Sequence, residues 1–212
     1  MNKLFALLSI LLFSFSYGQY YKAELLYKDG NTEKGLLNSL VDINNRKAKK
    51  AVFKSDENAQ KKVISVENVE RITYFNDDGS TSIGELVNFR NKRNLWAFKI
   101  KEVKDLTVYS ITVHIPAQYR SGGIITPSTT YTDYLFKYKD EAADHVFRHY
   151  VGPSIGEKAA NKKWLKKYFK DKCAKLAENV DELEYEKESP MPFVDYYETV
   201  SYTHLTLPTS DL

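Results

Sequence analysis

Hydrophobic and polar positions alternate along much of the chain before residue 152. In residues 106–115 apolar side chains fall at nearly every second position, and this is the period of a half-buried β-strand. Shorter runs with the same character and many Tyr, Phe, Val and Ile residues cover 20–28, 35–40, 51–55, 63–66, 69–75, 81–89, 95–100 and 131–138. Such residue types favour strands, so the pattern predicts a β-rich domain over residues 19–152.

The connections between these runs are short and carry turn residues. Asp29-Gly30-Asn31 and Asn76-Asp77-Asp78-Gly79 are the clearest turn sequences. No helical pattern separates the runs, which predicts an antiparallel meander that forms a sandwich or a partly open barrel.

After Pro153 the spacing of apolar residues changes to three and four. The residues that follow this spacing are Trp164, Leu165, Tyr168, Phe169, Cys173, Leu176 and Val180. They predict one long amphipathic helix within residues 153–188 that packs on the sheet. Pro190 and Pro192 are expected to stop the helix, and residues 189–199 are expected to be a truncated continuation. The fold class is therefore predicted as α+β, mainly antiparallel β followed by one long amphipathic C-terminal helix.

The first 18 residues have the layout of a secretory signal peptide. Lys3 precedes an apolar run from Leu4 to Phe15, and small residues follow at Ser16 and Gly18. The run is shorter than the ~20 apolar residues of a transmembrane helix. We therefore expect an exported chain that begins near Gln19, without a transmembrane helix. Its location is expected to be periplasmic, or outer-membrane associated if a missing C-terminal part supplies an anchor.

The last residues show no pattern that connects them to the preceding chain. The run Val200-Ser-Tyr-Thr-His-Leu-Thr-Leu-Pro-Thr209 resembles the translation of a transposon-end adapter used for sequencing libraries. We expect residues 200–212 to be a non-natural tail and the natural chain to diverge after Tyr197.

Charge and cysteine content narrow the function classes. The formal net charge is +3, from 31 Lys and Arg and 28 Asp and Glu residues, which gives no reason to expect nucleic acid as a partner. The lysines at 47, 49, 50, 61 and 62 are expected on the solvated face of a hairpin. Cys173 is the single cysteine, so an intramolecular disulfide is impossible. Whether it pairs with a residue of a missing part stays open.

Two histidines have the spacing of metal ligands. His145 and His149 are four residues apart, which places two imidazoles on one face of a helix, or on one face of a strand. No Glu occupies the metalloprotease position between them. The alternatives are a metal site and a pair of surface histidines, and the second is favoured.

The segment 117–130 is long for a hairpin connection and is rich in Ser, Gly and Thr. Long loops on a rigid sheet often carry binding residues. We consider Tyr119, Arg120, Gly122 and Gly123 as a contact surface for an envelope protein, a peptide or a glycan. The alternative is a hairpin extension without a binding role.

The remaining motifs do not indicate a reaction. No phosphate loop, dinucleotide fingerprint or nucleophile elbow is present, and we expect no cofactor. The sequence therefore favours a non-enzymatic binding or structural module. The alternative is a metal-dependent or other hydrolase that uses His114, His145 or His149.

Three features together resemble a group of uncharacterised exported β-rich proteins of Bacteroidota-type bacteria. They are the signal that ends Ser-Tyr-Gly-Gln, the Lys-Asp-Gly-Asn-Thr-x-Lys-Gly hairpin at residues 28–35, and Tyr168-Phe-x-Asp-x-Cys-x-x-Leu176. The resemblance implies an exported β-rich protein and brings no catalytic residues with it.

Overall fold

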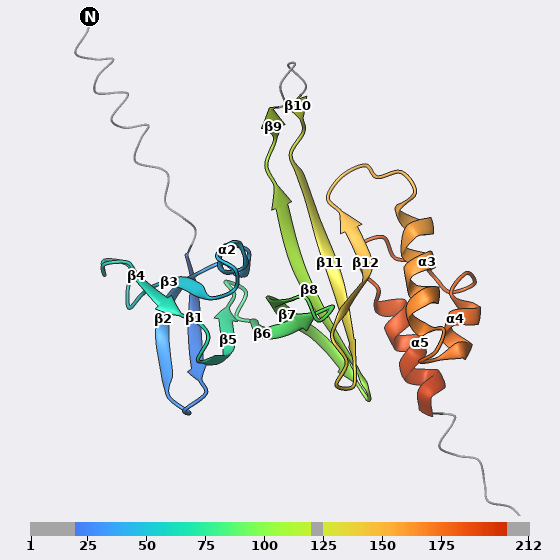
Figure 1. Cartoon of the computed structure of the whole chain (residues 1–212), viewed down its shortest axis with the longest axis horizontal. Helices are drawn as coiled ribbons and strands as arrows, with labels where there is room; N and C mark the ends of the chain where they lie inside the picture. The colour runs from blue at the N-terminus through green and yellow to red at the C-terminus, as the bar shows by residue number, and fades with distance from the viewer. Residues whose placement is uncertain (1–19, 120–124, 203–212) are drawn as a thin grey trace, which may run out of the picture. The chain divides into compact units, whose positions relative to one another are not determined.

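The computed structural model describes residues 20–119 and 125–202. These residues form two compact units, one up to Thr81 and one from Ser82 onward. Each unit is built mainly from antiparallel strands, which confirms the predicted β-rich class (Figure 1). The hydrophobic pattern does not predict the division after Thr81, because the strands on both sides of it have the same alternation.

The first unit contains five strands in the order β5-β1-β2-β3-β4. Their bounds are β1 Tyr20–Tyr27, β2 Thr32–Asn38, β3 Lys50–Lys54, β4 Lys62–Ser65 and β5 Val69–Phe75. The predicted turn between β1 and β2 is confirmed, and Gly30 adopts a φ of 86° there. Lys50, Lys61 and Lys62 lie in the β3–β4 hairpin, whereas Lys47 and Lys49 precede β3; all five lysines are exposed as expected.

Helix α2, Leu40–Asn45, was not predicted, because residues 35–40 read as the end of a strand. The residue that marks the start of α2 in the sequence is Ser39, whose hydroxyl accepts a hydrogen bond from the backbone N–H of Asp42. Leu40 and Ile43 are buried on its inner side. A close approach nearby requires Gly35, because a Cβ at this position would lie 2.3 Å from the carbonyl oxygen of Lys54.

The second unit has the strand order β12-β11-β8-β7-β6, which is a meander in chain order. The bounds are β6 Thr81–Phe89, β7 Arg93–Val103, β8 Leu106–Ile115, β11 Thr129–Tyr138 and β12 Asp144–Tyr150. The short strands β9 Gln118–Tyr119 and β10 Ile125–Thr126 pair with each other. An isolated parallel bridge joins Phe89 to Ala143, the residue that precedes β12.

The prediction of one long C-terminal helix is wrong. The structure has α3 Glu157–Phe169, α4 Ala174–Asn179 and α5 Met191–Tyr202 instead. Cys173 interrupts the helical path with φ −157° and ψ 84°, while its N–H bonds to the carbonyl oxygen of Phe169. The break turns α4 back, so that Leu176 reaches the same core as Phe169.

Helix α5 begins at the Ser-Pro-Met-Pro sequence that was expected to stop helical structure. Proline lacks only an N–H that the first turn leaves unbonded, so it suits a helix start. The N–H of Met191 donates to the hydroxyl of Ser189, which helps to fix this start. The helix includes Val200, the first residue of the adapter-like run.

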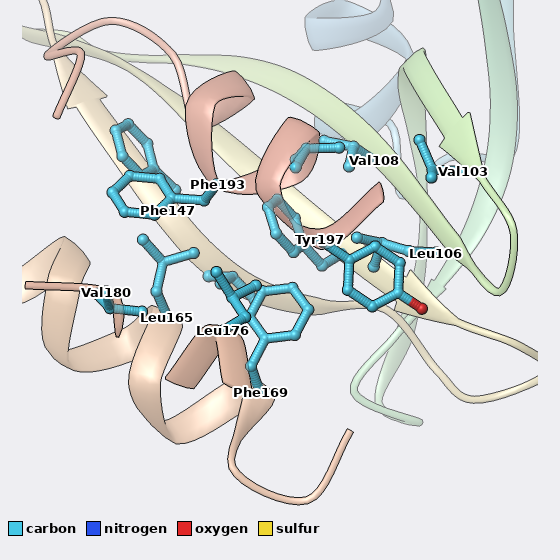
Figure 2. Close-up of a cluster of buried hydrophobic side chains, with 13 residues drawn as sticks. Val103, Leu106, Val108, Phe147, Leu165, Phe169, Leu176, Val180, Phe193 and Tyr197 are labelled. Atoms are coloured by element: carbon cyan, nitrogen blue, oxygen red, sulfur yellow. The ribbon is translucent and has the colours of Figure 1, made fainter. Parts of the chain in front are cut away.

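The three helices and one face of the sheet enclose the main core of the second unit, shown in Figure 2. Its buried residues come from β7, β8, β11, β12 and all three helices: Val103, Leu106, Val108, Phe136, Val146, Phe147, Leu165, Phe169, Leu176, Val180, Phe193, Val194 and Tyr197. A smaller cluster uses other side chains of β8 and β11, including Tyr109, Ile111 and Leu135. Side chains of β8 point alternately into these two clusters, so both faces of β8 are buried where the clusters pack against it.

Candidate functional site

A β-bulge in β12 decides where the two candidate histidines point. Leu135 of β11 pairs with His145, but the preceding residue, Tyr134, pairs with Phe147, so that Val146 is an extra residue in β12. Opposed residues of a pair share a sheet face. His145 therefore lies on the face of Leu135 and Asp133, and His149 lies on the opposite face.

Each histidine has its own carboxylate. His145 Nε2 lies 3.1 Å from Asp133 Oδ1, and His149 Nδ1 lies 3.5 Å from Glu157 Oε1. Neither of these ring nitrogens meets the geometry of a hydrogen bond in the structure. Their side chains are 10% and 15% exposed, so both are largely but not completely buried. Within residues 20–119 and 125–202, no three His, Cys, Asp or Glu side chains are grouped for a metal ion.

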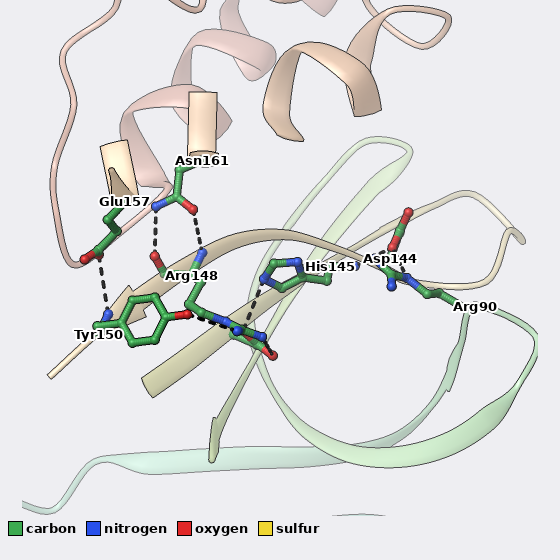
Figure 3. A network of polar contacts seen from close by, with 8 residues as sticks. Arg90, Asp144, His145, Arg148, Tyr150, Glu157 and Asn161 are labelled. Carbon is green, nitrogen blue, oxygen red and sulfur yellow. Dashed lines mark hydrogen bonds and ion pairs between the residues drawn. The ribbon is translucent and has the colours of Figure 1, made fainter. Parts of the chain in front are cut away.

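Asp133 also forms an ion pair with Arg148 on this face, and Figure 3 labels Arg148 and His145 in the same network. Arg148 binds its carboxylate with two nitrogens, Nε at 2.6 Å and Nη2 at 3.0 Å. The guanidinium lies 3.9 Å from the centre of the Tyr131 ring and donates to the Tyr150 hydroxyl at 3.2 Å. Burial alone would raise the pKa of Asp133, but its contacts with His145 and Arg148 outweigh burial and hold the pKa below its usual value.

Helix α3 covers the outer edge of β12 with polar side chains. The Asn161 side chain accepts from the N–H of Arg148 at 2.9 Å and donates to its carbonyl oxygen at 2.8 Å. The Tyr150 N–H donates to Glu157 at 3.4 Å. Asn161 is fully buried and Glu157 is 7% exposed. The two side chains thus replace the hydrogen bonds that a further strand would make.

A cavity of about 560 Å³ lies beside His145, between α3 and the segments that lead into β7 and β12. Its wall includes Arg90, Asp144, Trp164, Lys167 and Tyr168. The rings of His145 and Trp164 meet edge to face, with centroids 4.5 Å apart. The Tyr168 hydroxyl is buried with no hydrogen-bond partner among the described residues, and burial raises the pKa of this group. The hydroxyl therefore remains a proton donor.

The segment 117–130 is largely a continuation of the β8–β11 hairpin. Gln118 pairs with Thr126 and Tyr119 with Ile125, so Tyr119 lies in β9. Arg120, Gly122 and Gly123 lie outside the described residues. We call residues 113–119 and 125–131 the hairpin arm. Figure 1 shows β8 and β11 extending past the end of β12 toward β9 and β10. His114 belongs to the arm, with Nδ1 2.9 Å from the hydroxyl of Thr130.

One edge of β8 has no neighbouring strand along the start of the arm. Strand β7 pairs with β8 from Val103↔Leu106 to Phe98↔Ser110. In the described part of the chain, nothing pairs with residues 111–115 on that side. Thr112, His114 and Ile115 are exposed there. Backbone N–H and C=O groups along this edge are therefore not paired with another described strand.

The sequence analysis missed Asp133, Arg148 and Asn161. Asp133 sits in a run of tyrosines and threonines and has no spacing signal. Asn161 has a weak sequence signal, because a short amide on the core side of an otherwise apolar stripe must find polar partners. The pairing of Asp133 with Arg148 depends on the strand register, which no local pattern reveals.

No helix among the described residues is long and apolar enough to cross a membrane. Comparisons with protein-family models, with curated proteins and with solved structures give no match.

Proposed function

We propose that this chain is an exported, non-enzymatic module of the bacterial cell envelope that binds a protein partner through its hairpin arm. The observation that carries the proposal is the unpaired edge of β8 at residues 111–115, where Thr112, His114 and Ile115 are exposed. The signal-peptide pattern of residues 1–18 supports export, and export makes envelope proteins the available partners.

The free edge suits a partner that supplies an extended strand. Strand addition uses backbone hydrogen bonds for affinity and alternate side chains for specificity. The β8 edge offers both, since Thr112 and His114 lie on one face while Val113 and Ile115 lie on the other. The opposite side of the hairpin is better covered, because β12 pairs with β11 as far as Tyr131↔Tyr150. A partner strand would therefore add beside β8.

Site-specific photo-crosslinking tests this proposal in the full chain. A benzophenone amino acid at Ile115 is expected to capture a discrete envelope protein in living cells. The same group at Ile100 is the matched control, because Ile100 is also an exposed isoleucine of this unit, at 47% against 39%, but lies outside the arm. Capture at both positions or at neither would refute the arm as the binding surface.

A second candidate is a hydrolase in which His145 acts as a general base. It is favoured by the Asp133 carboxylate 3.1 Å from His145 and by the adjacent cavity, which together resemble a base held by an orienting acid. The described cavity wall contains no Ser, Thr or Cys as a nucleophile, so water would have to attack. Hydrolysis of an ester or glycoside panel that H145Q abolishes, with the fold intact, would support this candidate over the first.

A further inference from the structure

The cavity beside His145 holds equal numbers of positive and negative side chains. The positive ones are Arg90, Lys167 and Lys172, and the negative ones are Glu141, Asp144 and Asp171. Two ion pairs account for four of them: Arg90 Nε lies 2.5 Å from Asp144, and Lys172 Nζ lies 2.9 Å from Glu141. A charged ligand would meet as many like charges as opposite ones, so charge does not favour an anion or a cation.

The groups left over in the cavity include both donors and acceptors. Lys167 and Asp171 have no ion-pair or hydrogen-bond partner in the described part of the chain. Arg90 uses Nε for Asp144, which leaves its terminal nitrogens as donors. A ligand that satisfies this set must donate and accept at several points.

Aromatic side chains form the apolar part of the wall. Trp164 and Tyr168 both come from α3, and the contact of Trp164 with His145 fixes the indole against β12. An aromatic surface next to planar polar side chains suits a ring that has C–H groups on its face and hydroxyls at its rim. The volume of about 560 Å³ lies within the usual range of small-molecule sites.

We propose that this cavity binds a neutral saccharide. The ring packs on Trp164, and its hydroxyls bridge Lys167, Asp171 and the free nitrogens of Arg90. This inference is independent of the hairpin arm, because the cavity and the arm share no residue.

Titration of the full chain with neutral disaccharides tests the inference, with ligand-observed NMR as the readout. The probes are maltose, cellobiose, lactose and N,N′-diacetylchitobiose, and glucose 6-phosphate and glucosamine serve as charged comparisons. Saturable binding of at least one neutral disaccharide is expected. Lys167→Met should weaken that binding about tenfold, the loss of one charged hydrogen bond. Lys170→Met is the matched control, since Lys170 directly follows α3 and lies outside the cavity, and it should bind like the parent chain.

Three results would overturn the proposal. They are binding of the charged probes alone, binding of none of the probes, and equal weakening by Lys167→Met and Lys170→Met. Trp164→Phe gives an independent check, because it keeps an aromatic ring in the wall but reduces its surface. If circular dichroism shows that this variant is folded while its affinity equals that of the parent chain, the ring does not pack on Trp164.

Discussion

The second unit treats two strand edges in opposite ways. The outer edge of β12 is covered by α3, whose Asn161 and Glu157 satisfy the backbone of Arg148 and Tyr150. The edge of β8 at residues 111–115 has no such cover among the described residues. Both edges carry unpaired backbone groups from the strand itself, so the difference comes from what the rest of the chain places beside them.

Covering a strand edge with a helix requires a buried polar side chain, and this requirement can be seen in the sequence. Asn161 is a fully buried amide on a helix face that otherwise buries Leu165 and Phe169. A buried amide stabilises a fold only when its hydrogen bonds are made. Asn161 covers the β12 edge in this way, whereas no side chain among the described residues does so at residues 111–115 of β8.

Replacing Asn161 by Leu is expected to have the largest effect on stability. The change leaves the N–H and carbonyl of Arg148 buried without partners and removes the 3.1 Å contact with the Tyr185 hydroxyl. At about 1 to 3 kcal/mol for each orphaned group, we expect a loss of about 3 kcal/mol in the free energy of unfolding. Urea denaturation followed by circular dichroism measures it.

The control is Lys163→Leu, two residues further along α3 on its exposed side. It should change the unfolding free energy by less than ~0.5 kcal/mol. A loss of similar size in both variants would mean that α3 is sensitive to any change and that Asn161 does not clamp the edge.

The strands could be predicted from the sequence because each one is a local alternation closed by a turn. Residues 69–75 and 81–89 were predicted with the same bounds as β5 and β6. The helical region was harder. Of the residues with three- and four-residue spacing, Leu165, Phe169, Leu176 and Val180 are buried in one core, but Trp164 is not part of it. These core residues lie in or next to two helices, α3 and α4, and not in one. The break at Cys173 depends on tertiary packing and has no Gly or Pro to mark it.

The candidate site was less predictable than the fold. In a regular helix or strand, the spacing of His145 and His149 would place both side chains on one face. The extra residue Val146 instead places them on opposite faces of the sheet. A bulge is fixed by register with the neighbouring strand, so its effect lies outside any local pattern. The same reasoning applies to Asp133 and Arg148, which only the β11–β12 register brings together.

Asp133→Asn is expected to have the second largest effect. The carboxylate neutralises Arg148 and faces His145, with only 15% of its side chain exposed. Removing the carboxylate leaves the partly buried guanidinium of Arg148 without an opposite charge. We expect this to lower the free energy of unfolding by about 2 kcal/mol at neutral pH.

The pH dependence sharpens this prediction. The pKa of Asp133 is lowered in the folded state, so its stabilising contribution is complete above the unfolded-state pKa of about 3.9 and is lost as pH falls below it. The difference between the parent chain and Asp133→Asn should therefore be largest near neutral pH and shrink toward pH ~3. A difference that is constant with pH would show that the charge of Asp133 is not what stabilises this face.

Shortening the hairpin arm should change stability little. Replacing residues 116–128 by Asn-Gly closes a two-residue hairpin at the Ile115↔Thr129 pair. No residue of the helix-side core is touched, and a shorter loop costs slightly less entropy to close, so the unfolding free energy should change by less than ~1 kcal/mol. Capture of the envelope partner should weaken if its contacts extend beyond residue 115. If the shortened chain captures the partner as well as the parent chain does, the partner contacts residues 111–115 and nothing beyond residue 115.

The smallest effect on stability is expected from a single charge on the open edge. Ile115→Lys places a lysine beside the unpaired backbone of β8, where natural edge strands use lysine to prevent pairing. Ile115 is already 39% exposed, so the unfolding free energy should change by less than ~0.5 kcal/mol. Partner capture should nevertheless fall severalfold, whereas Ile100→Lys, with the same charge outside the arm, should leave it unchanged. If Ile115→Lys destabilises the unit as Asn161→Leu does, the β8 edge is packed rather than open, and the contrast between the two edges fails.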